Sequence, residues 1–393
     1  MWIRMRLDIG WRDIASGFGF CVMPIKRSIA EKRAKDSWSR GDDFLITLSV
    51  RSAFDLMLRA LQLPPGSEVL LSALTVPDMV RIVKLHELVP VPVDTDEAGN
   101  IISDSLKRAI SPQTRMIVIA HLFGGSAPLD EVHKVAKDHD LLVVEDCAQS
   151  FLRPGDSGHP ESDAALFSFG PIKTASALGG AVARIKSPEL RERMAGLLES
   201  DSIQSRKSFA LRIARFSVLK LLSGNFMAEF TRCCVERFGG DFDSMSNSAA
   251  RGFSSAELLK QLRRQPSTPL LRLMERRWQN YDFTRIDRRM RMGRLLDTKI
   301  GIKRGAFHSY WVYPIFVRDP IAVCERLCAA GFDATCQARM TVVPAIDDAR
   351  KAVSACSRWE HAVFLPWYPD MPFEALDDMI DLLSESDIRK GGI

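Results

Sequence analysis

The sequence predicts an α/β protein that has a large domain with a mostly parallel central sheet and a smaller C-terminal α+β domain. Between residues 45 and 190, short apolar runs bounded by Gly, Pro, Asp or Ser alternate with helical patterns. Such alternation favours a parallel sheet covered by helices on both faces. Beyond about residue 300 the order of strand-like and helix-like segments changes. We therefore expect a second, smaller domain there.

The individual elements follow from these patterns. Predicted strands in the first region cover 68–71, 89–93, 116–120, 141–145, 165–169 and 181–185, with helices at 52–61, 77–86, 103–109 and 130–139 between them. Residues 190–290 are helical and rich in arginine, with loops expected at 201–207 and 239–252. After them come strands at 309–317 and 362–365 and helices at 321–330 and 373–384. We divide the chain into an N-terminal segment (1–44), a large domain (45–245) and a smaller domain (246–393).

Composition excludes several classes of protein. The chain has 393 residues, of which 46% are hydrophobic and 26% charged, as in ordinary globular proteins. A net charge of +5 without a dedicated basic cluster does not indicate a nucleic-acid partner. The eight cysteines form no CxxC pair, and Cys324 and Cys328, four apart on a predicted helix, are expected to be buried thiols. We expect free thiols, no metal site and a cytoplasmic location.

One apolar segment, residues 209–230, carries Arg212, Arg215 and Lys220 among its hydrophobic residues. Such a pattern is compatible with a helix that lies on a membrane surface. It is more often a core or subunit-contact helix with a basic outer face. The sequence leaves both interpretations open.

Acidic side chains follow the predicted strand at 141–145. Glu145 and Asp146 end this hydrophobic run, so Asp146 is expected at the carboxyl edge of the sheet. Ligands of parallel α/β sheets gather at that edge. Acids in this position also cap helices or simply meet solvent.

A lysine follows the next strand. The segment 165–180 leads from an apolar run through Ser168 to Lys173 and then to small residues and two glycines. Burial among small apolar neighbours lowers the pKa of a lysine amine, which suits nucleophilic attack on a carbonyl carbon. The alternative is a surface lysine in a loop.

A third segment, residues 48–55, places Ser52 three residues before Asp55. This is the spacing of a capping box with Asp in place of Glu or Gln, so we expect a helix to begin at Ser52. The N-terminus of a helix binds phosphate through unpaired N–H groups and a partial positive charge. An ordinary capped helix has the same pattern.

These three segments together match one cofactor. Pyridoxal 5'-phosphate (PLP) requires an anion site for its phosphate, a carboxylate beside its ring nitrogen and a lysine for its aldehyde. The sequence offers a candidate for each of these groups.

The chain also resembles the DegT/DnrJ/EryC1/StrS family of PLP-dependent (fold type I) aminotransferases. The resemblance rests on Arg51-Ser-Ala53, Pro65-Gly-Ser-Glu-Val69, Ala73-Leu-Thr75, Val91-Pro-Val-Asp94, His121-Leu-Phe-Gly124, Glu145-Asp-Cys-Ala-Gln149 and Phe167-Ser-Phe-Gly-Pro-Ile-Lys173. It implies a fold-type-I PLP-transferase-like architecture, in which Lys173 binds the cofactor aldehyde and Asp146 pairs with the pyridine nitrogen. It further implies that Gln149 approaches the ring hydroxyl, and that Ser168, Ser52 and the Ala53 amide hold the phosphate. His121 has either a site role or a structural one.

The sequence departs from the family at several positions. Val76 stands where an aromatic residue usually stacks on the cofactor ring, and the turn at 177–180 lacks the family's glutamate. The asparagine motif that reaches the neighbouring subunit has no clear match; residues 251–255, with Ser254 or Ser255, lie in its region. The substrate segment of the family is replaced by residues 338–344.

The resemblance implies an aminotransferase that forms a homodimer. An amino donor, expected to be glutamate, would supply the amino group, and a keto acceptor such as a keto-sugar nucleotide would receive it. Two alternatives remain open: a PLP enzyme of another reaction type, and a non-catalytic regulatory or scaffold protein that has kept the fold.

Overall fold

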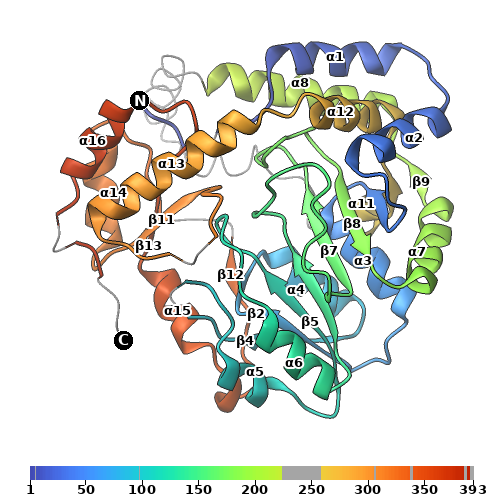
Figure 1. Cartoon of the computed structure of the whole chain (residues 1–393), viewed down its shortest axis with the longest axis horizontal. Coiled ribbons are helices and arrows are strands. Elements are labelled where there is room, and N and C mark those ends of the chain that lie inside the picture. Colours follow the sequence, from blue (N-terminus) through green and yellow to red (C-terminus); the bar gives the residue numbers. More distant parts are fainter. Residues whose placement is uncertain are drawn as a thin grey trace. The chain divides into compact units, whose positions relative to one another are not determined.

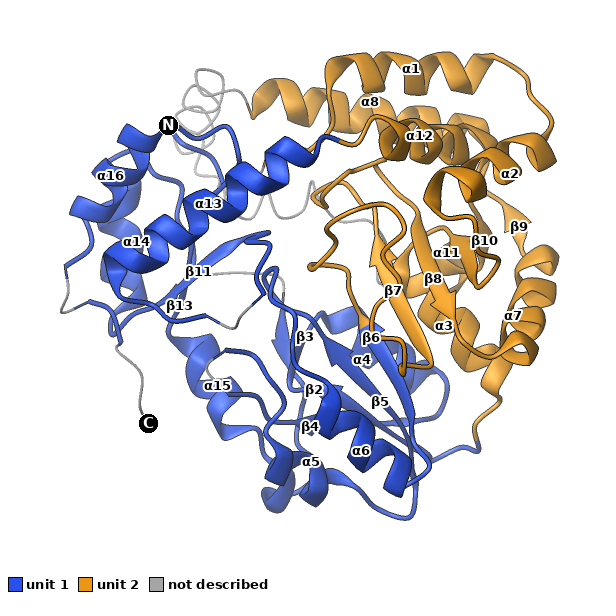
Figure 2. Cartoon of the chain, in the orientation of Figure 1, with its two compact units in different colours: residues 1–5, 64–145, 282–393 blue, residues 6–63, 146–281 orange. Residues whose placement is uncertain are grey.

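The computed structural model describes residues 1–4, 6–96, 98–223, 258–304, 307–336, 340–384 and 387–389. These residues form two compact units, shown in blue and orange in Figure 2. Unit 1 comprises residues 1–5, 64–145 and 282–393, and unit 2 comprises residues 6–63 and 146–281. The domain boundaries expected at residues 44 and 245 stay predictions, and the second lies outside the described residues.

Unit 1 contains the parallel strands that the sequence predicts. The strand order is β6 (Leu142–Asp146), β5 (Thr114–Ala120), β2 (Glu68–Ser72) and β4 (Val89–Val93), and β2 runs parallel to both β4 and β5. Three helices alternate with these strands: α4 (Pro77–Leu85), α5 (Ser103–Ala109) and α6 (Asp130–Asp138). Leu70, Val91 and Ile117 from three different strands pack in one apolar cluster. The apolar runs therefore form strands because both faces are buried.

The rest of unit 1 has the α+β character expected of the C-terminal region. Its elements are α13 (Phe283–Ile300), β11 (Tyr313–Phe316), α14 (Pro320–Ala329), η1 (Asp348–Arg350), α15 (Val353–Glu360), β13 (Ala362–Leu365) and α16 (Phe373–Asp381) (Figure 1). Strands β11 and β13 pair antiparallel, and β12 (Thr341–Val342) pairs antiparallel with β3 (Leu74–Thr75). The strand expected at 309–317 is shorter because Tyr310 has a φ of 51°, which interrupts the extended backbone.

Tyr310 belongs to a buried polar cluster in unit 1. The hydroxyls of Tyr310 and Tyr313 both donate to the carboxylate of Asp297, with 2.7 Å for the Tyr310 bond. Arg304 donates to the same carboxylate at 2.9 Å and to the carbonyl of Pro314 at 2.8 Å. Burial raises the pKa of both tyrosines, so they remain hydrogen-bond donors. The cluster is a structural network in which each charged group has partners.

Unit 2 contains three further strands, β1 (Phe44–Thr47), β7 (Ala164–Ser168) and β8 (Ala181–Ile185). Strand β8 runs antiparallel to both β1 and β7. The loop 169–180 that joins β7 to β8 contains no helix, whereas the crossover between parallel neighbours usually does. This loop carries Lys173.

Helices make up the remainder of unit 2. They are α1 (Trp11–Val22), α2 (Arg27–Trp38), α3 (Val50–Leu61), α7 (Pro188–Ser200), α8 (Arg206–Leu222), α11 (Leu258–Leu262) and α12 (Thr268–Gln279), and a short parallel pair joins β9 (Ser202–Ile203) to β10 (Arg264–Gln265). The ring of Trp38 lies 5.1–5.9 Å from the rings of Phe151, Phe167, Phe169 and Trp278. The N-terminal segment is thus part of this core. Within the described residues, no helix has the length and apolar character needed to cross a bilayer.

Candidate active site

The loop between β7 and β8 is closed by backbone hydrogen bonds. The carbonyl of Phe169 accepts from the amides of Ala177 and Gly179 at 3.0 and 3.1 Å, and the Phe169 amide donates to Gly180 at 3.0 Å. Lys173 donates its own amide to Gly170 at 3.1 Å. These bonds give the segment around Lys173 a defined path and fix where its side chain begins.

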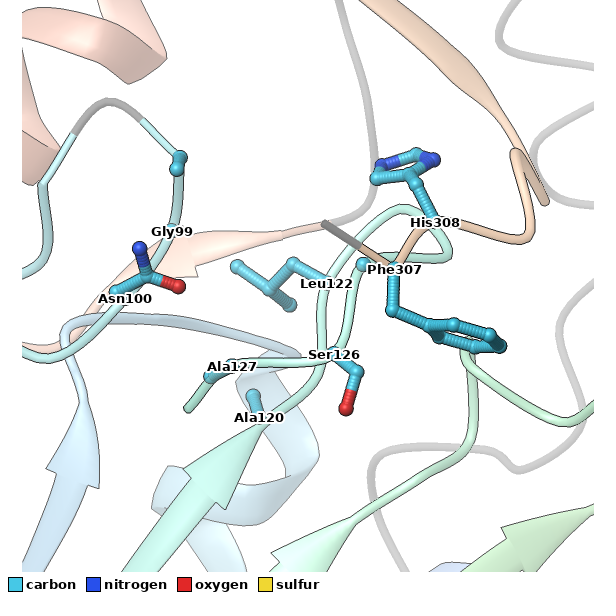
Figure 3. A pocket seen from close by; sticks show the side chains of 10 residues that line it. Gly99, Asn100, Ala120, Leu122, Ser126, Ala127, Phe307 and His308 are labelled. Atoms are coloured by element: carbon cyan, nitrogen blue, oxygen red, sulfur yellow. The ribbon is translucent and has the colours of Figure 1, made fainter. Parts of the chain in front are cut away.

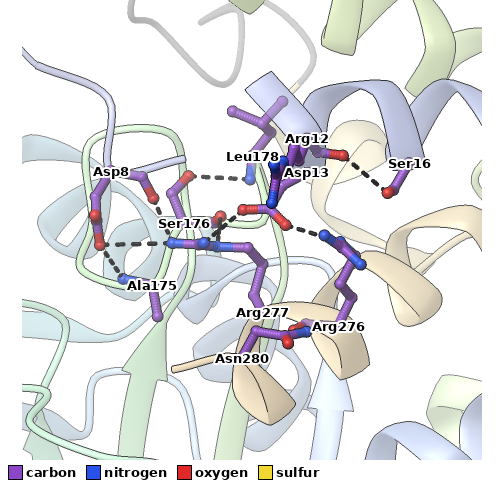
Figure 4. A network of polar contacts seen from close by, with 10 residues as sticks. All are labelled: Asp8, Arg12, Asp13, Ser16, Ala175, Ser176, Leu178, Arg276, Arg277 and Asn280. Carbon is purple, nitrogen blue, oxygen red and sulfur yellow. Dashed lines mark hydrogen bonds and ion pairs between the residues drawn. The ribbon is translucent and has the colours of Figure 1, made fainter. Parts of the chain in front are cut away.

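Two residues of this loop have a left-handed backbone. Ala175 has a φ of 53° and Leu178 a φ of 62°, a conformation that costs side-chain-bearing residues about 1 kcal/mol or more. Figure 4 shows the contacts that hold the loop in this path: the Ala175 amide donates to Asp8 at 2.7 Å, and Arg277 donates to the Ser176 carbonyl at 3.0 Å. The surrounding structure therefore over-determines the conformation of the loop.

Arg277 is the centre of this network. Its Nη1 donates to Asp13 at 2.7 Å and its Nη2 to the Asp8 carbonyl at 2.7 Å. The second oxygen of Asp13 accepts from Arg276 at 2.8 Å, and Asp13 is buried. Sequence reasoning missed all four residues, because Asp8 and Asp13 lie more than 250 positions before Arg277. No local pattern marks such a contact.

The amine of Lys173 is the most strongly perturbed base in unit 2 among the described lysines. Burial lowers its pKa from the ordinary value of 10.5, attraction by Asp146 opposes this shift, and repulsion by the Arg51 guanidinium adds to it, so that the resulting pKa is about 7. A large fraction of this amine is therefore neutral near pH 7 and available as a nucleophile or base. The prediction made from its small neighbours agrees with this environment.

Asp146 is the last residue of β6, and Gln149 follows three residues later. Asp146 is half-buried at the carboxyl end of the strand, as expected, and one of its oxygens accepts the Ala148 amide at 3.0 Å. Because Asp146 raises the pKa of Lys173 by attraction, its carboxylate lies within electrostatic range of the amine. Gln149 is half-buried in the turn three residues further on. Its role toward a ring hydroxyl stays a prediction.

Helix α3 begins at Val50, two residues earlier than the sequence suggested. The residue at its N-cap is Ser49, whose hydroxyl accepts the Ser52 amide at 3.1 Å and lies 3.0 Å from the Ser52 hydroxyl. Asp55 does not cap the helix: its carboxylate binds Arg263 at 3.1 and 3.2 Å. The expected capping box at Ser52 was wrong because Ser49 satisfies the amide at the third helical position.

The start of α3 lies beside the lysine loop. Gly180, at the end of that loop, donates its amide to the carbonyl of Leu48 at 2.9 Å, one residue before the N-cap. Ser52 and Ala53 are both buried in the first turn. The helix N-terminus that the sequence offered as an anion site is thus held against the segment that carries Lys173.

The side chains of Ser168 and Lys173 both lie close to Gly170. A Cβ atom added to Gly170 would lie 3.6 Å from the Ser168 hydroxyl and 3.8 Å from Cγ of Lys173. Ser168 is half-buried at the last position of β7. The structure therefore brings Ser168, Lys173, Asp146 and the start of α3 together in one unit.

Two arginines add positive charge to this region. Arg51 lies in the first turn of α3, and Arg212 of α8 donates through Nε to the carbonyl of Leu178 in the lysine loop. Burial lowers the pKa of Arg212 to about 10, and the nearby Arg215 and Arg51 guanidinium groups contribute to the shift. An excess of cations at this point favours an anionic ligand.

Other candidate positions lie in unit 1. His121 is buried, where its Nε2 donates to Glu145 at 2.8 Å and its Nδ1 accepts the Ala127 amide at 3.1 Å, so both ring nitrogens serve structural bonds. Val76 is half-buried immediately before α4. Residues 251–255 lie outside the described residues, as do 338 and 339 of the segment 338–344.

Unit 1 also has a small pocket (Figure 3), lined by Ala98, Gly99, Asn100, Ala120, Leu122, Gly125, Ser126, Ala127, Phe307 and His308. Burial, followed by repulsion from Arg304 and Arg289, lowers the pKa of His308 to about 3. Its imidazole is therefore uncharged near neutral pH, and its Nδ1 accepts the Tyr310 amide at 3.0 Å. The pocket presents small polar groups and no charge.

The described cysteines are free, and Cys324 and Cys328, which we expected to be buried, are half-buried. Cys21, Cys147, Cys324, Cys328, Cys336 and Cys356 form no disulfide. Burial, with a contribution from the neighbouring Cys336 and Cys328, raises the pKa of Cys324 to about 12. This thiol stays protonated and unreactive at neutral pH.

Known proteins are similar to this chain in the region that contains the family motifs. Residues 41–215 match the model of the DegT/DnrJ/EryC1/StrS aminotransferase family. One relative, the UDP-N-acetyl-3-dehydro-alpha-D-glucosamine 3-aminotransferase of Acidithiobacillus ferrooxidans, is 32% identical over 157 residues, which are 39% of this chain and 42% of that protein. Another, the dTDP-4-dehydro-2,6-dideoxy-D-glucose 3-dehydratase of Saccharopolyspora spinosa, is 35% identical over 100 residues, 25% of this chain and 22% of that protein. The chain thus spans less than half of these relatives.

The fold extends further than the sequence similarity. The aminotransferase TlmJ from Streptoalloteichus hindustanus superposes with a TM-score of 0.71 over 97% of both chains, at 16% identity. This confirms the expected fold class. The family resemblance is confirmed for residues 41–215, the range that contains Lys173, Asp146, Gln149, Ser168, Ser52 and Ala53.

Proposed function

We propose that this chain, whose residues 41–215 carry the DegT/DnrJ/EryC1/StrS aminotransferase sequence, is a PLP-dependent aminotransferase. It would move an amino group from an amino acid, by resemblance glutamate, to a keto acceptor such as a keto-sugar nucleotide. The observation that carries the proposal is the Lys173 amine, whose pKa is lowered to about 7 beside Asp146 and the start of α3. A homodimeric, cytoplasmic enzyme is part of the proposal and rests on the resemblance.

The residues present fit PLP. The cofactor needs an anion site, a carboxylate and a reactive amine, and unit 2 supplies the α3 N-terminus with Ser49 and Ser52, the Asp146 carboxylate and Lys173. Ser168 and the Ala53 amide would help to hold the phosphate, and Gln149 would approach the ring hydroxyl. When bound, PLP supplies an electron sink for a carbanion formed on the substrate.

The chain's own groups would perform the proton chemistry. With a pKa near 7, Lys173 can accept a proton at neutral pH and return it, as general acid–base catalysis requires. Asp146 would pair with the pyridine nitrogen and keep a proton on it. The loop network of Arg277, Asp8 and Asp13 would hold the backbone at 175–178, which begins two residues after Lys173, and so help to keep the lysine loop in place.

The acceptor is proposed from the relatives. The name of the Acidithiobacillus relative specifies a nucleotide sugar with a keto group at carbon 3. Positive charge from Arg51 and Arg212 is compatible with a phosphorylated cofactor or substrate.

A two-part experiment tests the function. Purified protein mixed with PLP should develop visible absorption from the bound cofactor, and borohydride should fix PLP covalently on Lys173. In a separate sample that is not treated with borohydride, addition of glutamate should convert the bound cofactor to its amine form and release 2-oxoglutarate in equal amount. If PLP binds but neither glutamate nor any other amino acid produces this conversion, the aminotransferase proposal is wrong.

A second function is favoured by one observation. The Saccharopolyspora relative is named as a sugar dehydratase, so the matched region also occurs in a protein that removes water instead of transferring an amine. Loss of a hydroxyl from a keto-deoxy sugar without net amine transfer would identify this alternative. Mass spectrometry of the sugar product separates the two reactions, because only amino transfer introduces nitrogen.

A further inference from the structure

Helices α1 and α8 of unit 2 lie side by side and antiparallel (Figure 1). Arg206, at the start of α8, donates to the carbonyl of Met23, at the end of α1, at 3.2 Å. At the other end, the Lys220 amine lies 5.8 Å from the centre of the Trp11 ring. The two helices therefore present one continuous surface.

This surface carries exposed apolar side chains. Leu211, Val218 and Leu221 of α8 are 62%, 54% and 58% exposed, and they lie on one side because they are spaced seven and three residues apart. On α1, Trp11, Phe18 and Val22 are exposed as well. We call these six residues the α1/α8 apolar face.

The opposite side of α8 is apolar too. Phe209, Ile213 and Phe216 are fully buried in the core of unit 2. A helix on the surface of a water-soluble unit normally has one apolar side and one polar side. Because the inner side already fills the core, the outer apolar residues are not needed to fold unit 2, and they require a different explanation.

The charges around this face have one sign. Helix α8 has five cationic residues, Arg206, Lys207, Arg212, Arg215 and Lys220, and no acidic residue. The acid in α1, Asp13, is buried and bound by Arg276 and Arg277. Exposed Lys207, Arg215 and Arg12 therefore border the apolar side chains, and neither helix supplies an exposed carboxylate.

We propose that the α1/α8 apolar face docks on the surface of an anionic phospholipid membrane, with both helices parallel to the bilayer plane. Apolar side chains would enter the boundary between headgroups and acyl chains, and the lysine and arginine side chains would reach lipid phosphates. The proposal goes beyond the aminotransferase function and does not depend on it.

Charge also argues against a second copy of the chain as the occupant. A two-fold symmetric contact would place the same surface of both copies together, so the exposed Lys207 and Arg215 would face the cations of the partner. An anionic lipid surface instead complements them, and attraction of basic segments to such surfaces is well established physically.

Vesicle flotation of the purified full chain tests the proposal. We expect co-flotation with vesicles of phosphatidylglycerol and phosphatidylcholine in equal parts, and none with phosphatidylcholine alone. High salt should weaken this binding, because screening reduces the attraction between exposed charges. Two surface variants, Lys207→Glu with Arg215→Glu and Leu211→Ser with Val218→Ser, should each lower the vesicle partition coefficient by about tenfold or more.

Matched control variants distinguish binding through the α1/α8 apolar face from effects of overall charge or of exposed apolar side chains elsewhere. Lys186→Glu with Arg193→Glu makes the same charge change at exposed positions elsewhere in unit 2, and Ile321→Ser removes a side chain that is 65% exposed in unit 1. Both should float like the wild type, and thermal melts should show all variants folded. The proposal is overturned if the wild type does not float with anionic vesicles or if the controls lose as much binding as the face variants. It is also overturned if light scattering shows that the Leu211→Ser, Val218→Ser variant only dissociates an oligomer without changing flotation.

Discussion

Unit 1 and unit 2 each contain a buried ionisable group. The surroundings stabilise the charge of the group in unit 1 and disfavour the charge of the group in unit 2. In unit 1, the Asp297 carboxylate accepts bonds from Tyr310, Tyr313 and Arg304, and the pKa of Arg304 is raised, so its charge is stabilised. In unit 2, burial lowers the pKa of Lys173 to about 7, so its charge is disfavoured. A charge with matched partners serves the fold, whereas a destabilised charge is prepared for chemistry.

The backbone around the two groups differs in the same way. Gly293 allows the Tyr310 ring to pack against α13, where a Cβ atom would lie 2.3 Å from the ring, and the result is a tightly packed structural cluster. The lysine loop instead contains left-handed Ala175 and Leu178, held by Asp8 and Arg277. Strain of this kind persists where the surrounding structure enforces it, and functional loops are where it commonly occurs.

Removal of the lysine should have the largest effect. Lys173→Ala should lower the rate of amino transfer by about a thousandfold or more, because it removes both the cofactor attachment and the proton carrier. The measurement is the rate of 2-oxoglutarate release from glutamate. Lys186→Ala, an exposed lysine in the same unit, serves as the control and should retain full activity.

Removal of the buried Asp297 charge should affect stability, whereas removal of Lys173 should affect activity. Asp297→Asn should lower the free energy of unfolding by about 3–5 kcal/mol, because it leaves the Arg304 guanidinium buried without its carboxylate. Lys173→Met should not destabilise the cofactor-free protein. Urea unfolding of both variants measures the contrast, and an equal loss of stability in both would remove the distinction between the two sites.

The loop network should have an intermediate effect. Arg277→Gln should lower kcat by about ten- to a hundredfold while KM changes little, because a displaced lysine loop misaligns the reacting amine. Arg285→Gln removes an exposed ion pair with Asp370 in unit 1 and should leave kcat unchanged. A loss confined to thermal stability, with kcat intact, would show that Arg277 serves only the fold.

The smallest effect, taken per pH unit, is the pH dependence of stability. Because the pKa of Lys173 is lowered in the folded state, the unfolded chain binds more protons than the folded chain between about pH 7 and 10.5. Lys173 therefore lowers the free energy of unfolding. This destabilisation is complete below pH 7 and disappears as the pH rises to 10.5. The stability gained by Lys173→Met over wild type should therefore shrink with rising pH, by at most about 1.4 kcal/mol per pH unit. Urea unfolding of cofactor-free protein at several pH values measures it. A gain that is constant with pH would contradict the lowered pKa.

The sequence could predict what depends on neighbouring residues. Apolar runs with bounded ends predicted the strands β4 and β8 with their correct ends, and acids or lysines placed after strands identified Asp146 and Lys173. The choice between Ser49 and Ser52 as the residue that caps α3 depended on backbone geometry that the spacing alone does not determine. Local patterns place candidates to within about a helical turn.

What the sequence could not predict depends on contacts between distant segments. Arg277 reaches Asp8 and Asp13 across 269 and 264 positions, and Tyr310 adopts a left-handed backbone within an apparently extended run. Antiparallel β8 was also missed, although the short connection from β7 offered a signal. Contacts between residues more than 250 positions apart, such as those of Arg277, produce no periodic pattern in the sequence.

The pH dependence of PLP attachment tests the central claim most directly. Cofactor-free protein is mixed with PLP over a range of pH, the adduct is fixed with borohydride, and the fraction labelled at Lys173 is measured by mass spectrometry. We expect the initial rate of labelling to rise with a midpoint near pH 7, and Arg51→Gln to move that midpoint to higher pH by removing a repulsive charge. A midpoint near the ordinary lysine value of 10.5, or labelling at other lysines in place of Lys173, would contradict the account.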